Sequence, residues 1–128
     1  MIETSRRQLR ILVVDDNLDT AMGLSLLMRA LGHKPHMTHD GLSAVDAALE
    51  CQPDLVLLDI GLPGMDGWEV ARRFRQDPTL SDVTLVAVTG RSGDEAKCRA
   101  VEAGFDHFIV KPADVDQLQK IMAVACEI

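Results

Sequence analysis

Five side chains with ionisable or hydroxyl groups end short apolar runs in this chain of 128 residues. Asp15 and Asp16 follow "ILVV", and Asp59 follows "LVLL". Thr89 and Lys111 close the runs "LVAVT" and "FIVK" in the same way. Carboxylates that meet at one point repel one another unless a cation offsets their charge. Mg²⁺ can do so, because it binds oxygen ligands and uses one or two carboxylates together with phosphate oxygens.

These side chains can meet only if the apolar runs are strands of one sheet. Apolar runs alternate with segments whose apolar residues recur at helical spacing, which predicts βαβ units and a parallel sheet. We expect an α/β fold with a doubly wound, five-stranded parallel sheet and helices on both faces. The predicted strands are 9–14, 34–39, 54–59, 83–89 and 107–110, and the predicted helices are about 18–31, 41–50, 67–76, 94–103 and 114–128.

The carboxyl ends of parallel strands share one edge of the sheet, where ligands bind in this architecture. Taken singly, the side chains there have structural explanations, because one of Asp15, Asp16 and Asn17 must cap the following helix. The strand "KPHMTH", which contains Pro35, suits a sheet edge and offers nothing obvious to the site. Taken together, three acids, a hydroxyl and an ammonium predict a metal-dependent site, to which a buried strand delivers Asp59.

The motifs "VVDDN", "LLDIGLPGMDG", "AVTG" and "IVKP", in this order and at these distances, resemble the receiver domain of two-component response regulators. The resemblance covers nearly the whole chain, from about Leu9 to Ala125, so we expect residues 1–128 to form a single receiver domain. It implies the flavodoxin-like strand order 2-1-3-4-5.

The resemblance also implies the chemistry. Asp59 would accept a phosphoryl group from the phosphohistidine of a histidine kinase or a histidine phosphotransfer protein. Asp16 would contact Mg²⁺, or Mn²⁺ in its place, with Asp15 helping through water and the backbone carbonyl of Gly61 completing the protein's ligands. Such a domain catalyses its own phosphorylation and dephosphorylation but does not turn over an external substrate.

Further roles come from the same resemblance. Thr89 would hydrogen-bond the phosphoryl group, Lys111 would pair with it, and the peptide bond before Pro112 would be cis. Thr89 and Phe108 match the switch positions that couple phosphorylation to an output face of the fourth helix, fifth strand and last helix. Phe108 also fits plain core packing. Because it lacks the hydroxyl of the tyrosine that many relatives carry, its readout would rest on packing alone.

Gly61 and Arg91 stand two residues beyond Asp59 and Thr89. In the family, these positions control how water reaches the phosphoryl group. Gly61 leaves that approach open, whereas Arg91 either covers it or is solvated, so the sequence leaves the lifetime of the phosphorylated state open.

The expected first helix carries two apolar rows. Leu18, Met22 and Leu26 form a row that faces away from the predicted sheet-facing stripe. Neighbouring helices could cover this row, and scattered exposed apolar residues are ordinary. Receivers dock the first helix against the helical bundle of the phosphohistidine protein, however, so we interpret the row as a docking ridge. The sheet-facing stripe consists of Thr20, Leu24, Leu27, Met28 and Leu31.

The net charge of −7 argues against general affinity for nucleic acid, and no apolar segment approaches the roughly 20 residues of a membrane span. The three cysteines lack metal or disulfide spacing and indicate reduced thiols in a cytoplasmic protein. We expect His33, His36 and His39 to be surface and edge histidines, because His36 and His39 would face opposite sides of a strand.

Two other functions share features with this sequence. A receiver-like module that acts only through protein contacts, independently of phosphorylation, would have no need to keep three crowded acids. A flavodoxin-like FMN binder would need a Ser/Thr/Gly-rich phosphate loop after the first strand, where this chain has acids that repel phosphate. Phosphoryl transfer is therefore the favoured function.

The parent protein and the oligomeric state are left open by the sequence. The last predicted helix reaches the end of the chain, so we expect a stand-alone receiver or one cut from a larger protein. The segments "DIGLPGMDGWEVARRFR" and "AGFDHFIVKPAD" are somewhat more similar to receivers of hybrid histidine kinases than to those of transcription factors.

Overall fold

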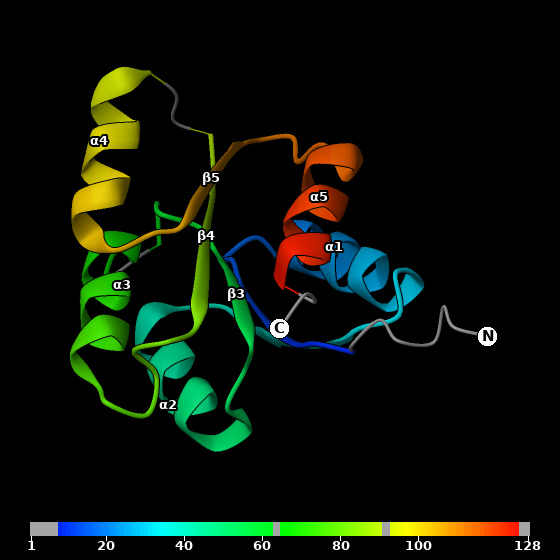
Figure 1. Ribbon diagram of the computed structural model, residues 1–128, viewed down its shortest axis with the longest axis horizontal. Coiled ribbons are helices and arrows are strands. Elements are labelled where there is room, and N and C mark those ends of the chain that lie inside the picture. The colour runs from blue at the N-terminus through cyan, green and yellow to red at the C-terminus, as the bar shows by residue number, and fades with distance from the viewer. Residues whose placement is uncertain (1–7, 63–64, 91–92, 126–128) are drawn as a thin grey trace.

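The computed structural model describes residues 8–62, 65–90 and 93–125. Strands and helices alternate through these ranges as the sequence predicts, and most boundaries agree to within one residue (Figure 1). The last predicted helix extends into residues 126–128, which lie outside the described ranges. The strands are β1 (Arg10–Val14), β2 (Lys34–Thr38), β3 (Leu55–Leu58), β4 (Thr84–Thr89) and β5 (His107–Val110). The helices are α1 (Leu18–Ala30), α2 (Gly41–Cys51), α3 (Gly67–Gln76), α4 (Asp94–Ala103) and α5 (Val115–Ala125).

The strands form one parallel sheet in the order β2-β1-β3-β4-β5, which confirms the predicted order. β2 lies at the edge, as its Pro35 indicated. Val14 at the end of β1 pairs with Thr38 on one side and Leu58 on the other. The residues that follow these three strands therefore emerge close together at the carboxyl ends of the strands.

Helices cover both faces of the sheet, and alternate residues of each strand point to opposite faces. Leu12 and Val14 pack in the core beneath α2, α3 and α4, whereas Ile11 and Val13 pack in the core beneath α1 and α5. Figure 1 shows this division, with α1 and α5 on one side of the strands and the other helices opposite. No helix in the described ranges has the length and apolarity needed to cross a membrane.

The buried face of α1 differs from the predicted stripe. Leu24 and Met28 are buried as predicted, but Thr20, Leu27 and Leu31 are only half-buried. The rest of the buried face consists of small residues, Ala21 and Ser25. Small side chains let the helix backbone approach the sheet, so the helix is rotated away from the position that large apolar residues alone would favour.

The three histidines do not form a common site, but one of them is not at the surface. His33 is 5% exposed, and its Nδ1 accepts a hydrogen bond from Leu9 N at 3.0 Å. It thereby joins the turn before β2 to the start of β1, which corrects the prediction of three surface or edge histidines. His36 is exposed, as predicted, and His39 is half-buried.

Candidate functional site

Asn17 caps α1 and leaves both preceding acids available for other contacts. Its Oδ1 accepts a hydrogen bond from Thr20 N at 3.1 Å, which satisfies a backbone donor in the first turn of the helix. The structure thus selects Asn17 among the three candidate caps. Asp15 and Asp16 are not needed for this role.

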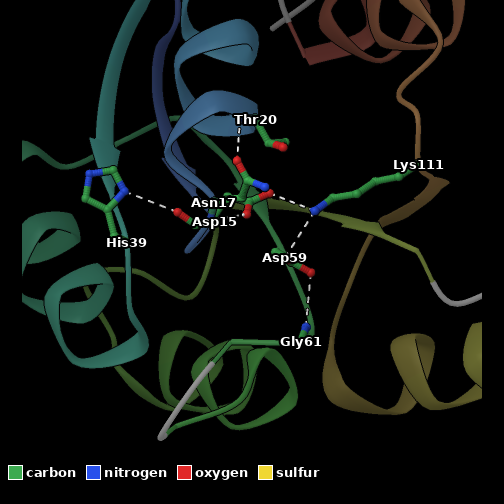
Figure 2. A network of polar contacts seen from close by, with 7 residues as sticks. All are labelled: Asp15, Asn17, Thr20, His39, Asp59, Gly61 and Lys111. Carbon is green, nitrogen blue, oxygen red and sulfur yellow. Dashed lines mark hydrogen bonds and ion pairs between the residues drawn. The ribbon is translucent and has the colours of Figure 1, made fainter.

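The Asp15 carboxylate is buried, with a side chain 2% exposed, and both of its oxygens have donors. Oδ1 accepts a hydrogen bond from Asn17 N at 2.9 Å, and Oδ2 accepts one from Lys111 Nζ at 2.8 Å (Figure 2). Asp16 is exposed, and its carboxylate has no hydrogen-bond partner in the described ranges. The turn after β1 therefore places one acid inside the protein and the next at its surface.

Asp59 lies immediately beyond β3 and beside the turn that carries Asp15. Its backbone N donates to Val14 O at 2.9 Å, which continues the pairing of β1 with β3. Oδ1 accepts a hydrogen bond from Gly61 N at 3.0 Å, and Oδ2 accepts one from Lys111 Nζ at 3.2 Å. The rigid end of a buried strand thus fixes this acid at the sheet edge.

Lys111 joins the two buried acids through an ion pair with each. Burial by itself would lower the pKa of the ammonium, but hydrogen bonds to Asp15 and Asp59 outweigh burial and raise the pKa above its ordinary value. The Lys111 backbone N also donates to Thr89 O at 2.7 Å. The peptide bond to Pro112 is cis, as the family resemblance implied.

Asp15, Asp16 and Asp59 together fit a small, hard cation. One carboxylate oxygen from each lies within 4.8 Å of the others. Oxygen donors suit Mg²⁺, which also keeps several waters, and the exposure of Asp16 leaves room for them. Lys111 offsets only part of the charge of three carboxylates, so the donor set has the number and chemistry that a divalent cation requires.

The two predicted switch residues lie on neighbouring strands. Thr89 ends β4 with 2% exposure, and Phe108 in β5 is half-buried against the core beneath α2, α3 and α4. Ala87, two residues before Thr89, pairs with Phe108 across the two strands. Gly61 is exposed beside the acids, whereas Arg91 lies outside the described ranges.

Gly67, the first residue of α3, forms a close backbone contact beneath Asp59. A Cβ atom at this position would lie 2.7 Å from Asp59 O and 2.6 Å from Ile60 Cα. Gly67 N also donates to Ile60 O at 2.9 Å. Because the nearest atoms belong to the backbone, only glycine lets α3 begin this close to the site.

The predicted docking ridge is exposed on α1. Leu18, Met22 and Leu26 have exposures of 58%, 52% and 65%, so no helix of the described chain covers them. A groove of about 530 Å³ also borders α1, between Leu24 and Leu27 on the helix and Lys111 and Pro112 in the loop after β5. The groove reaches Lys111, which pairs with both buried acids.

The edge strand contributes a residue that the sequence interpretation overlooked. His39 directly follows β2, and its Nδ1 lies 3.2 Å from the backbone oxygen of Asp15 (Figure 2). The predicted strand 34–39 ends on His39, which places this residue near the carboxyl ends of the other strands but does not indicate its contact with Asp15. A polar edge strand that ends on histidine carries no further signal, because histidine also fits an exposed strand end.

Comparison with protein families gives a match to the family described as "Response regulator receiver domain" over residues 11–123. The chain is 41% identical over 103 residues to the DNA-binding response regulator MtrA of Mycobacterium tuberculosis H37Rv, covering 80% of this chain and 44% of MtrA. The chain spans less than half the length of the curated relatives it matches.

Solved structures show the same fold. A protein assigned as a response regulator from Chloroflexus aurantiacus has a TM-score of 0.88 at 27% identity, with 94% of this chain and 98% of that chain covered. The receiver domain of the sensor histidine kinase PA1611 from Pseudomonas aeruginosa has a TM-score of 0.82 at 28% identity, with 91% and 95% covered. That structure has a magnesium ion coordinated in its active-site cleft.

Proposed function

Because this chain belongs to the response regulator receiver domain family, we propose that it is a phosphorylation switch in which Asp59 accepts the phosphoryl group. One observation carries the proposal. Asp59 ends a buried strand with its Oδ2 at 3.2 Å from an ammonium, and two further acids lie within cation-binding distance. A carboxylate with a nearby cation site is a suitable acceptor in phosphoryl transfer.

The transfer needs an ionised nucleophile and positive charge around the moving group. A carboxylate oxygen of Asp59 attacks the phosphorus of a phosphohistidine, an O–P bond forms as the N–P bond breaks, and the electron pair stays with the histidine nitrogen. The Lys111 ammonium would pair with the Asp59 carboxylate before transfer and with the phosphoryl oxygens during and after it. The Thr89 hydroxyl would hydrogen-bond one of those oxygens. Water attack on phosphorus breaks the bond between phosphorus and the Asp59 oxygen, which returns Asp59 to its carboxylate and releases inorganic phosphate.

Mg²⁺, or Mn²⁺, would be held by Asp15, Asp16, Asp59 and the carbonyl of Gly61. When bound, such an ion neutralises charge that develops on the phosphoryl oxygens. Asp15 is held rigidly by Asn17 N and Lys111 Nζ, whereas Asp16 is exposed and open to solvent waters. This difference supports direct contact by Asp16 and a supporting role for Asp15.

The acceptor role can be tested with a small acyl phosphate. We expect the protein with Mg²⁺ and acetyl phosphate to gain one phosphoryl group, detected by intact-protein mass spectrometry. Asp59→Asn should abolish the gain and remain folded, because removing one of several crowded acids lowers their repulsion. Asp46→Asn, at an exposed acid of α2, is the matched control. Undiminished phosphorylation of Asp59→Asn would eliminate Asp59 as acceptor, whereas no phosphorylation of the original chain would favour the phosphorylation-independent module.

Coupling to the rest of the signalling protein would use Thr89 and Phe108. Lys111 N donates to Thr89 O, so the phosphoryl-binding ends of β4 and β5 are tied together. Phe108 packs against the core beneath α4, where movement of its ring would alter the face formed by α4, β5 and α5. The half-buried state of Phe108 leaves such a movement possible sterically.

The partner would be a histidine kinase or a histidine phosphotransfer protein that docks on Leu18, Met22 and Leu26. The exposure of this ridge supports the assignment. Met22→Glu should slow transfer from a phosphorylated phosphotransfer protein at least tenfold and leave acetyl phosphate labelling almost unchanged. Leu49→Glu on α2, 44% exposed, is the control and should affect neither reaction. Equal loss with both donors would indicate misfolding, and no loss with either would eliminate the ridge.

The chain can be a stand-alone receiver, part of a hybrid kinase, or part of a regulator with an output domain. The neighbour from PA1611 belongs to a sensor histidine kinase, which supports the hybrid-kinase context. MtrA is a DNA-binding response regulator, and this chain spans 44% of it, which supports the regulator context. Reading the gene on both sides of these 128 codons distinguishes these contexts.

A further inference from the structure

The end of the edge strand holds the backbone of Asp15 from two adjacent residues. Asp15 N donates to Thr38 O at 3.2 Å. The next residue, His39, places its Nδ1 at 3.2 Å from Asp15 O, as Figure 2 shows. A carbonyl oxygen only accepts hydrogen bonds, so the imidazole must carry a proton on Nδ1 in this contact.

This contact acts on the peptide unit between the two acids. The carbonyl of Asp15 and the amide of Asp16 share one plane, because the peptide bond is rigid. Fixing the Asp15 oxygen therefore fixes the direction in which the chain enters Asp16. This matters most for Asp16, whose exposed carboxylate has no hydrogen-bond partner in the described ranges and takes its direction from the backbone.

We propose that His39 is a positioning residue for the divalent cation, holding the Asp15–Asp16 peptide so that the Asp16 carboxylate stays beside Asp15 and Asp59. This inference rests on the proposed function, because it assigns His39 a role at the same site. His39 does not contact the cation or the phosphoryl group. It acts through the backbone, as residues behind metal ligands commonly do by orienting the ligands.

The test compares three variants by isothermal titration with Mg²⁺ alone. His39→Ala removes the donor and should weaken Mg²⁺ binding roughly three- to tenfold, the range expected for one positioning hydrogen bond. His39→Asn keeps a donor, since its Nδ2 stands where the imidazole Nδ1 was, and should restore most of the affinity. His36→Ala, at an exposed histidine of the strand that precedes His39, is the matched control and should bind like the original chain.

A second readout separates positioning from folding. The Mg²⁺ concentration that half-saturates acetyl phosphate labelling should rise with His39→Ala by the same factor, while the labelling rate at saturating Mg²⁺ stays near that of the original chain. Measurements below each variant's Tm exclude unfolding as the cause.

Several results would overturn the inference. One is an unchanged Mg²⁺ affinity in His39→Ala. The others are an equal loss of Mg²⁺ affinity in His36→Ala, or a folded His39→Asn that binds Mg²⁺ no more tightly than His39→Ala does. If the original chain itself binds no Mg²⁺, the proposed metal site fails, and the inference fails with it. That outcome is distinguishable, because it appears before any substitution is made.

Discussion

Lys111 is the internal counter-ion of the site. Its ammonium pairs with Asp15 and Asp59 at 2.8 and 3.2 Å, and these contacts raise its pKa. A lysine with a raised folded-state pKa contributes its full stabilisation below the ordinary value of 10.5 and loses it only as the pH rises through the higher folded-state value. The ion pairs should therefore persist across the neutral and moderately alkaline range.

Replacing this ammonium should make folding depend on metal. Lys111→Met keeps the length of the side chain but leaves two buried acids without their cation. Without Mg²⁺ we expect the free energy of unfolding to fall by about 1–2 kcal/mol, less than for a fully buried pair because Lys111 is partly exposed. Mg²⁺ binds only the folded site, so it should raise the Tm of this variant more than that of the original chain.

Thermal unfolding in EDTA and in millimolar Mg²⁺ measures both effects. Lys97→Met, at an exposed lysine of α4, is the control and should change neither Tm nor its response to Mg²⁺. An equal Mg²⁺ response in Lys111→Met and the original chain would show that Lys111 does not balance the acids.

At the level of residues, the sequence predicts those site members that directly follow apolar strands. Asp15, Asp59 and Lys111 could be located because the end of each strand fixes where the next side chain emerges. The contact of His39 with Asp15 could not, because it depends on the register between β1 and β2 and on a ring orientation. Local spacing contains no information on either.

At the level of elements, α3 is positioned by a glycine that fits against the site. Gly67 packs on the backbone of Asp59 and Ile60, and Trp68, the chain's single tryptophan, follows it in the core. The Trp68 ring meets Phe105 edge-on at a centroid distance of 6.1 Å. The start of α3 therefore links the end of β3 to the loop between α4 and β5.

Gly67→Ala should disturb the site through this contact. Its Cβ would overlap backbone atoms of Asp59 and Ile60, so we expect a loss of about 1–3 kcal/mol in stability. Acetyl phosphate labelling should slow, and the emission of Trp68 should shift. Gly23→Ala in α1, where a Cβ meets nothing within 4 Å, is the control and should stabilise the protein by up to about 1 kcal/mol. Two variants of equal stability would contradict the close contact.

The orientation of α1 is a detail that the apolar pattern of one helix does not determine. Periodicity identified the helix and its exposed row, because large apolar residues recur at helical spacing. The predicted stripe does pack on the core through Leu24, Leu27, Met28 and Leu31, but it lacks the buried Ala21 and Ser25, which are small and add little to an apolar pattern. How closely a helix approaches its sheet is a property of both surfaces, and one helix sequence describes only one of them.

At the level of the whole molecule, the carboxyl ends and the amino ends of the strands have different roles. The acids lie at the carboxyl ends of the strands, and Arg75 joins the turns at the amino ends of β4 and β5. Its guanidinium donates to the carbonyls of Ser81, Val83 and Gly104 at 2.6–2.9 Å and pairs with Asp106 at 2.8 Å. These contacts hold the turns before β4 and β5 against the end of α3.

Removing this guanidinium should lower the stability of the protein without changing the rate of labelling at the acidic site. Arg75→Met leaves several carbonyls without their donor, and we expect a loss of about 2–3 kcal/mol in the free energy of unfolding. The rate of acetyl phosphate labelling, measured well below the Tm, should stay the same, because the substitution lies at the amino ends of the strands. Arg72→Met on the same helix is exposed and should change stability by no more than about 0.5 kcal/mol. Denaturant unfolding checks both values, and a labelling defect in Arg75→Met would show that the two ends of the strands are coupled.

The ion pairs of Lys111 join residues that the ribosome synthesises at different times. Lys111 is separated from Asp15 by 96 residues and from Asp59 by 52. A ribosome makes the chain from its N-terminus, so both acids are synthesised long before their ammonium. Until Lys111 emerges, the nascent polypeptide carries both acids without the ammonium that pairs with them in the folded chain. Asp15 and Asp59 are thus made first, and the lysine that pairs with both of them is made later.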